Sequence, residues 1–311
     1  MIFKKSLPLL IATSLTASLN AHAQSSDLMP SLYGKANVTA VLNDYEIGDS
    51  SGELESNASR IGLKGEVPLS DALKVVYQAE YQVNPGEEVY HHFGLSQRNS
   101  YIGLEGGFGT VVVGRNDTPA KLMQNGIDLF NDLNGDIRTL FVSEVRPNDE
   151  IHYTSPTVSG FTLMHASIID GQDSLRERAS KSTSTALTYG QGNYLFGIAM
   201  DNNLTGHDSF RFMSRYRSGG LQLGFMYESA QTSKGENDGI FVSASYKMDK
   251  LVLKAQTGAA DQKKAGAVQS TIGADYNLDA DSKVFAFVSS TSADNPTVDN
   301  QQYGVGFEYN F

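Results

Sequence analysis

The 311-residue sequence contains no cysteine and no tryptophan. Without cysteine, the chain has no disulfide, no thiolate nucleophile and no zinc site of the cysteine type. Positive charge is also scarce, because 24 lysines and arginines stand against 35 aspartates and glutamates. Binding of nucleic acid needs a basic surface, so this balance argues against nucleic acid as a partner.

Long apolar runs are absent too: none reaches the roughly 18 residues of a membrane-spanning helix. The short apolar stretch at residues 7–19 follows Lys4 and Lys5 and precedes Ala21-His22-Ala23, which fits the cleavage pattern of a signal peptide. We therefore expect a cleaved signal peptide at residues 1–23 and an exported domain at residues 24–311. Removing the two lysines leaves 22 basic and 35 acidic residues, a formal charge of −13.

The dominant pattern that is present is alternation. In residues 32–42, leucine, glycine, alanine and valine occupy the even positions, and polar residues occupy most odd positions. Such a period of two predicts strands with one apolar and one polar face. It returns in residues 73–82, 221–227, 240–246 and 302–311.

Turn signals and longer polar stretches alternate along the chain, which predicts sixteen strands. The short turns are expected at residues 69–71, 106–107, 159–160, 191–193, 219–220, 249–250 and 279–281. The longer loops are expected near residues 44–57, 84–97, 117–149, 170–181, 201–208, 229–238, 260–268 and 292–300.

Short turns at one end, long loops at the other and an even strand number are typical of outer-membrane barrels. We therefore predict an all-β fold, a 16-stranded antiparallel transmembrane β-barrel. A soluble β-sandwich or propeller is the alternative. Charged residues on the polar face of nearly every strand, and the regular order of short and long connections, favour the barrel.

Residues 117–149 interrupt this pattern with about thirty residues of helical or irregular character and an acidic middle. A loop of that length inside a strand-rich domain is usually functional or disordered. Leu122, Ile127, Phe130 and Phe141 give this segment too many apolar side chains to stand free in water. We predict that it folds into the lumen of the barrel as a constriction loop and narrows it.

Three blocks, at residues 59–82, 98–119 and 153–161, resemble the general porins of Gram-negative bacteria. The final strand, which ends in Phe311, is similar to the aromatic signal that the barrel-assembly machinery reads. The resemblance implies a homotrimeric, 16-stranded diffusion porin of the cell outer membrane with an inward-folded third loop. It implies as partners other copies of the chain, outer-membrane lipid and lipopolysaccharide, and small hydrophilic solutes and ions.

The resemblance also implies a constriction in which acidic loop residues face a basic wall. By that resemblance the acidic positions are Asp128, Asp132 and Asp136, and the basic positions are Lys35, Arg60, Arg115 and Arg146. Lys64 joins the basic set because it shares with Arg60 the strand face opposite Ile61 and Leu63.

Two kinds of position depart from the pattern of the relatives. Relatives often carry arginine where Val112 and His152 stand, which suggests a less basic wall, and in the loop motif Asn131 and Asn134 replace a proline and a glycine. Strict alternation also places Arg115 on the same side as Val111 and Val113, so that an inward Arg115 requires a bulge at Gly114.

Arg211, Arg215 and Arg217 alternate with aromatic residues. This pattern fits equally a basic stripe that steers anions and ordinary polarity of a lumen wall. Asp132-Leu133-Asn134-Gly135-Asp136 resembles half of a calcium loop, but Ser143 stands where such a loop needs glutamate, so a pore-lining loop is the preferred interpretation.

The predicted function is passive diffusion of ions and small hydrophilic solutes, with selection by size and mildly by charge. Such a channel needs no cofactor or metal. The sequence holds no Gly-x-Ser-x-Gly motif and no convincing Ser/His/Asp set, so we predict that it is not an enzyme. The alternatives are a porin that prefers a sugar or dicarboxylate, an adhesive barrel, and, least favoured, a barrel enzyme.

Overall fold

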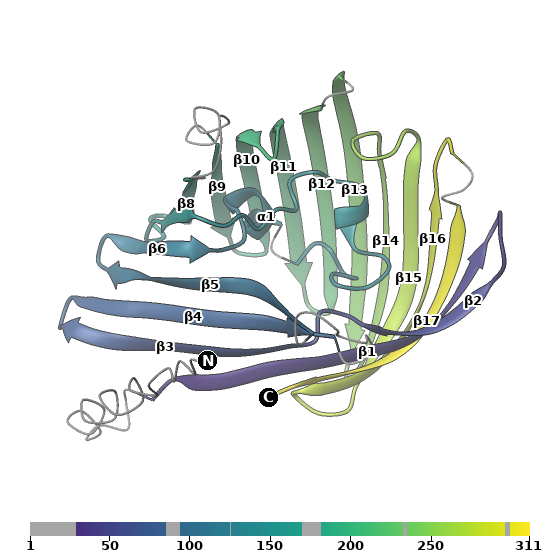
Figure 1. Cartoon of the computed structure of the whole chain (residues 1–311), viewed down its shortest axis with the longest axis horizontal. Helices are drawn as coiled ribbons and strands as arrows, with labels where there is room; N and C mark the ends of the chain where they lie inside the picture. The colour runs from purple at the N-terminus through teal and green to yellow at the C-terminus, as the bar shows by residue number, and fades with distance from the viewer. Residues whose placement is uncertain (1–28, 85–93, 125, 170–181, 233–234, 296–298) are drawn as a thin grey trace, which may run out of the picture.

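The computed structural model describes residues 29–84, 94–124, 126–169, 182–232, 235–295 and 299–311. The predicted signal peptide and the predicted loop at residues 170–181 lie outside these described residues. The described strands form one antiparallel sheet that closes on itself where β1 pairs with β17 (Figure 1). Among the described residues, no helix is long and apolar enough to span a membrane.

The elements follow one another around the sheet in chain order. They are β1 (Ser31–Tyr45), β2 (Ser51–Ser56), β3 (Arg60–Ser70), β4 (Leu73–Val83), β5 (Leu95–Gly106), β6 (Gly109–Arg115), α1 (Pro119–Met123), η3 (Ile137–Thr139), β7 (Glu150–Thr154), β8 (Phe161–Ile168), β9 (Thr183–Gln191), β10 (Tyr194–Leu204), β11 (His207–Ser218), β12 (Leu221–Thr232), β13 (Gly235–Met248), β14 (Leu251–Ala260), β15 (Ala267–Asn277), β16 (Ser282–Ser292) and β17 (Asn300–Asn310).

β2 and β3 are two halves of one strand of the barrel. β2 pairs with the second half of β1, and β3 pairs with its first half. The break between them contains Ala58, whose φ of 51° is unusual for a residue with a side chain. Counted together, they make the described sheet a closed, 16-stranded antiparallel β-barrel, and this part of the prediction is confirmed.

The short connections lie at the predicted turns, but three of the predicted long loops consist largely of strand. β2 lies within the loop predicted at residues 44–57. β10 continues to Leu204 and β11 begins at His207, and β12 and β13 likewise extend through most of residues 229–238. Polar residues in these stretches still pair across the ladder, as Ser229 does with Asp238. Alternation of hydropathy marks only the strand portion that meets an apolar environment, whereas backbone pairing continues beyond it.

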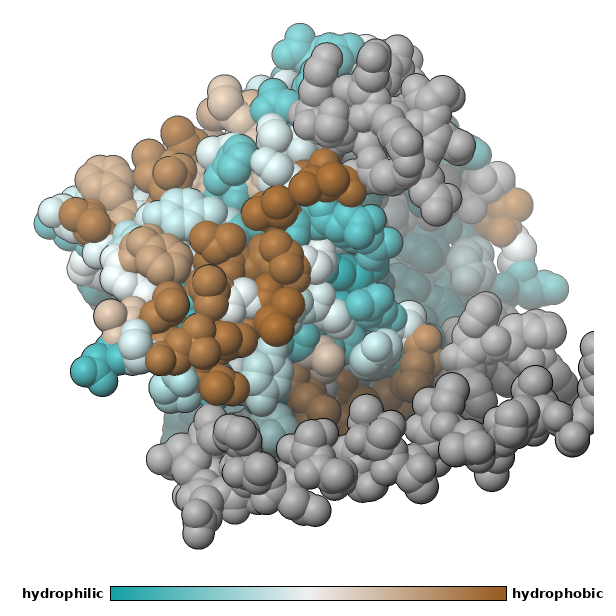
Figure 2. Space-filling view, turned by 60° about the vertical axis from the view of Figure 1, so that its left-hand side comes forward, coloured by the Kyte–Doolittle hydropathy of each residue, from teal (hydrophilic) through white to brown (hydrophobic). Residues whose placement is uncertain are grey.

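Apolar side chains face outward, which reverses the arrangement of a soluble protein. On β10, Ile198 is 46% exposed, whereas its neighbour Ala199 is 2% exposed. The outer surface in Figure 2 shows apolar residues gathered beside a hollow that hydrophilic residues line. Because a charged side chain on the lipid face of a barrel costs about 2–4 kcal/mol at mid-membrane, the charged side chains gather on the other face.

Candidate functional site

Residues 117–149, which we call the loop segment, pack against the sheet face opposite the exposed apolar residues (Figure 1). Its fully buried side chains include Met123, Ile127, Phe130, Ile137 and Phe141. Their partners on the sheet are Ala186, Ala199, Met213, Met226, Phe241, Ala260, Ala267, Phe285 and Phe287. Burial of such side chains stabilises by roughly 1.5–3 kcal/mol each, which explains why an irregular segment holds one position.

Glutamines of the sheet satisfy the backbone of the loop segment. The side chain of Gln256 donates to the carbonyl of Gly135 at 2.8 Å and accepts from the amide of Leu129 at 2.8 Å. Gln222 donates to the carbonyl of Gly126 at 2.9 Å. A buried segment without regular secondary structure needs such partners for its N–H and C=O groups.

The loop segment approaches the sheet closely at Gly135. A Cβ atom there would lie 2.6 Å from Oγ1 of Thr271 and 3.0 Å from Cβ of Phe130. A larger residue at this position would therefore collide with Thr271 on β15.

Arg211 on β11 holds the loop segment to the sheet. Its guanidinium lies 2.6 Å from Glu228 on the neighbouring strand and 2.7 Å from Glu144 of the segment, and all three side chains are buried. It also donates to the carbonyl of Ala120 at 3.1 Å. Since Arg211 is fully enclosed, it is not available to steer ions, and the stripe that the sequence suggested does not include it.

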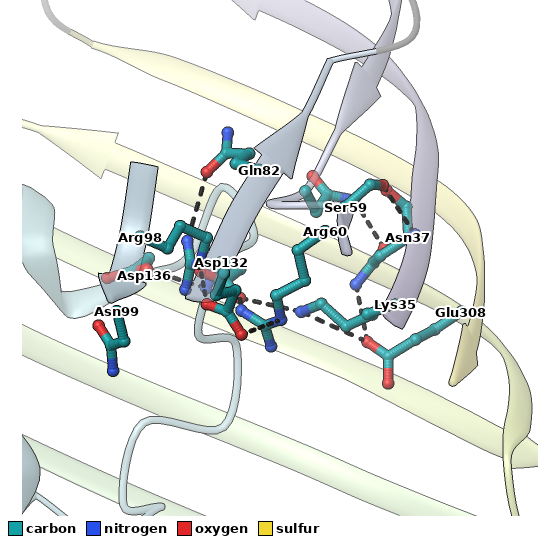
Figure 3. Close-up of polar contacts among 12 residues, drawn as sticks. Lys35, Asn37, Ser59, Arg60, Gln82, Arg98, Asn99, Asp132, Asp136 and Glu308 are labelled. Atoms are coloured by element: carbon teal, nitrogen blue, oxygen red, sulfur yellow. Dashed lines mark hydrogen bonds and ion pairs between the residues drawn. The ribbon is translucent and has the colours of Figure 1, made fainter. Parts of the chain in front are cut away.

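A chain of ion pairs joins the loop segment to the opposite part of the sheet (Figure 3). Asp132 lies 2.9 Å from Nζ of Lys35 on β1 and 3.5 Å from Arg60 on β3. Arg60 lies 3.8 Å from Glu80, which lies 2.7 Å from Arg98. Asp132 is thus the member through which the segment meets β1 and β3.

The chain continues in the other direction across the pairing of β1 with β17. Lys35 lies 4.0 Å from Glu308, which is 3.5 Å from Lys283. Asp275 then lies 3.2 Å from Lys283 and 2.7 Å from Lys254, which donates to the segment at Leu129. Charges of alternating sign therefore run from β5 to β14.

The three predicted acidic residues have different surroundings. Burial disfavours the charged form of Asp132, but Lys35, Arg98 and Arg60 outweigh it and hold the pKa below its usual range. Burial, with Asp136 nearby, raises the pKa of Asp128 to about 8, although Gln256 and two backbone amides donate to its carboxylate. Burial likewise raises the pKa of Asp136, which accepts from the amides of Asp132 and Arg138. Only Asp132 meets the predicted basic residues.

The remaining predicted basic residues do not form one cluster. Arg146 lies 3.0 Å from Asp117, which also pairs with Lys121 at 3.0 Å. Arg115 follows Gly114, whose φ is 139°, and donates to Asn148 at 2.6 Å. Nζ of Lys64 lies 5.1 Å from the centre of the Tyr33 ring.

A shift in strand register determines the direction in which Arg98 points. Alternation counted back from Tyr101 assigns Arg98 to the outward face. The register between β4 and β5 shifts here, because Ala79 pairs with Ser100 whereas Tyr81 pairs with Gln97. A bulge of this kind redirects a side chain, and no hydropathy pattern records it.

A cavity of about 320 Å³ is lined by the loop segment and by Arg98 of β5. Its basic lining residues are Arg98, Lys121, Arg138 and Arg146, and its acidic ones are Asp117, Asp128, Asp132, Asp136 and Glu144. The basic members are the more accessible ones: the side chain of Arg138 is 63% exposed, whereas that of Asp136 beside it is 4% exposed. Within the described residues, no cluster of three or more His, Asp or Glu is placed to hold a metal ion.

The buried Asp128 predicts a pH-dependent stability. Between its ordinary pKa of 3.8 and about 8, the folded state binds more protons than the unfolded state. The free energy of unfolding should therefore fall as pH rises from about 4 to about 8, by roughly 1.4 kcal/mol for each pH unit between the two pKa values. Urea unfolding in detergent at several pH values measures this fall.

Asp128→Asn should reduce this pH dependence, and Asp149→Asn, at an exposed position of the same segment, should leave it unchanged. If wild type and Asp128→Asn show the same slope, Asp128 does not carry the effect.

Comparison with known proteins places this geometry in a family. A profile described as Gram-negative porin matches residues 9–311. Major outer membrane protein P.IB of Neisseria sicca is 32% identical over 115 residues, which cover 35% of this chain and 31% of that protein. Major outer membrane protein P.IA of Neisseria meningitidis serogroup B is 36% identical over 107 residues, 33% of this chain and 26% of that protein. The matching stretch thus spans less than a third of these relatives.

Solved structures share the fold over much more of the chain. An anion-selective porin from Comamonas acidovorans has a TM-score of 0.72 at 18% identity, covering 91% of this chain and 99% of that one. OmpF of Salmonella typhi in complex with daunomycin has a TM-score of 0.75 at 17% identity, covering 92% of this chain and 98% of that one. The chain belongs to the Gram-negative porin family and is a β-barrel protein of the bacterial outer membrane.

Proposed function

We propose that the protein is a passive diffusion channel for ions and small hydrophilic solutes, and that the loop segment narrows its lumen. The observation that carries this proposal is the double attachment of the segment. It packs on β9–β16 through buried side chains and reaches β1 and β3 through Asp132. The passage that remains lies beside the segment at the 320 Å³ cavity, where Arg98 of β5 faces the segment.

The proposed constriction prefers anions weakly. Its carboxylates are enclosed or paired, whereas the guanidinium groups of Arg60 and Arg138 are the more exposed members of their pairs. The structurally similar Comamonas protein is described as anion-selective. Since a pore selects by the charges that its ions meet, the negative charge of the whole chain does not decide the preference.

In planar lipid bilayers, the purified protein should produce stepwise increases in conductance in KCl. In a tenfold KCl gradient, the sign of the reversal potential should show a preference for chloride. The chloride-to-potassium permeability ratio should be about two, as expected of weakly exposed charge. The absence of conducting steps would reject the channel, and a reversal potential of the opposite sign would reject only the anion preference.

The functional assembly that we propose is a homotrimer of chains processed after residue 23. Family membership favours a channel over the adhesin and enzyme alternatives. Native mass spectrometry of protein extracted from the outer membrane should give three times the mass of a chain beginning at Gln24. A monomer, or a chain that retains residues 1–23, would contradict the corresponding part of the proposal.

A further inference from the structure

A second cavity, of about 490 Å³, lies along β3–β7 on the short-turn side of the constriction. The two cavities share Leu122 in their lining and therefore lie next to each other. Besides Leu122, the residues that line the second cavity include Lys64, Val76, Val112 and Asn116, together with the carboxylates Glu66 and Glu105.

One side of this cavity is apolar. Leu122 is 39% exposed, although its neighbours on α1, Ala120 and Met123, are fully buried against the sheet. Val112 and Val76 line the same space. An apolar patch in a wet lumen gains free energy when an apolar group of a solute covers it.

The cation of this cavity is not neutralised by the protein. Lys64 has no carboxylate partner among the described residues, whereas Lys35, Lys121 and Lys254 each have one within 3.0 Å. The two carboxylates of the lining, Glu66 and Glu105, are both paired with Lys74, at 2.6 and 2.9 Å. The ammonium group of Lys64 is therefore available to bind an anionic solute.

The aromatic support of Lys64 is held in place. The hydroxyl of Tyr33 donates to Glu80 at 3.0 Å and accepts from Gln78 at 2.9 Å, and Gln78 accepts from Tyr101 at 3.0 Å. The ring of Tyr33 lies under Nζ of Lys64 at 5.1 Å. A fixed ring restricts where the ammonium group lies, and this lowers the cost of ordering it around an anion.

We infer that this cavity is a binding subsite for small organic carboxylates with an apolar body, an aromatic carboxylate being the best fit. The carboxylate lies at Lys64, with the amide of Asn116 as a further donor, and the apolar body covers Leu122. This inference rests on the proposed channel function and adds a solute class to it.

The test uses the whole channel in planar bilayers with dilute KCl and compares benzoate, acetate and benzyl alcohol as blockers of chloride current. Benzoate should reach half-maximal block at about a tenfold lower concentration than acetate, because its ring covers part of the apolar patch. Benzyl alcohol, which lacks the charge, should block more weakly than benzoate.

Lys64→Gln should raise the half-blocking concentration of benzoate by about threefold or more, as loss of one partly exposed charge predicts. Lys247→Gln, which removes a lysine outside this cavity, should not change it. Leu122→Gln should abolish the difference between benzoate and acetate, and Leu122→Met should keep it. Because Lys64 and Leu122 are exposed, KCl conductance reports that each variant is folded.

Equal block by benzoate and acetate in a conducting wild-type channel would overturn the inference and leave the channel proposal intact. A benzoate preference that survives both Lys64→Gln and Leu122→Gln would also overturn it, because the subsite would then lie elsewhere. Absence of any conductance in KCl would overturn the channel proposal itself, and the inference with it.

Discussion

Arg211→Met should lower the free energy of unfolding by about 3–5 kcal/mol, the usual effect of removing one partner from a buried ion pair. The substitution keeps an unbranched side chain of similar length but leaves Glu144 and Glu228 buried without their cation. Both carboxylates lie within 2.7 Å of the guanidinium, and both are enclosed. Burial already raises the pKa of Glu144 against the opposing effect of Arg211, so its charged form depends on that arginine.

The measurement is the urea concentration at the midpoint of unfolding in detergent. Far-ultraviolet circular dichroism monitors the unfolding, because the chain has no tryptophan. Arg217→Met is the matched control. Arg217 lies on the same face of β11, but it donates to Gln222 and pairs with no carboxylate among the described residues. If Arg211→Met is no less stable than Arg217→Met, the buried ion pairs do not hold the loop segment.

A triple variant separates charge from packing. When Glu144→Gln and Glu228→Gln accompany Arg211→Met, no buried charge is left unpaired, and most of the lost stability should return. Glu228 also accepts from the amide of Val142, and a glutamine oxygen can keep that hydrogen bond. A triple variant as unstable as the single one would show that the methionine fails to pack.

The sequence predicted the barrel because hydropathy of period two is a local signal. Lys64 and Arg60 lie on one face of β3 as alternation requires, and Ile61 and Leu63 lie exposed on the other. The same signal failed at Arg98, where a register shift changes the side to which the chain points. Alternation of hydropathy therefore predicts which face of the sheet a residue lies on only where the strand pairing is regular.

The charge network could not be predicted because it depends on long-range pairing. Lys35 and Glu308 are neighbours only because the first and last strands close the sheet. Arg211 looked like a lumen cation in the sequence, since nothing local shows that Glu144 of the loop segment covers it. Likewise, the resemblance grouped Asp128, Asp132 and Asp136, but burial depends on which of them Gln256 and the segment backbone enclose.

Asp132→Asn should shift the channel toward anions more than any other single neutralisation in the loop segment. The aspartate is held charged by Lys35 and Arg60, so the amide leaves two cations that a passing ion meets without their counter-charge. At about 4 Å in a water-filled lumen, one charge is worth about 1 kcal/mol, which corresponds to about a fivefold rise in the chloride-to-potassium permeability ratio. Glu80 and Glu308 remain near the two cations and keep the effect from being larger.

The reversal potential in a KCl gradient measures this ratio, and Asp128→Asn is the matched control. Asp128 lies in the same segment, but its carboxylate is enclosed by Gln256 and two backbone amides, so its neutralisation should leave the ratio nearly unchanged. Equal shifts in the two variants would mean that ions sense total charge rather than exposed charge. No shift in Asp132→Asn would place the narrowest point of the pore away from the contact of the loop segment with β1 and β3.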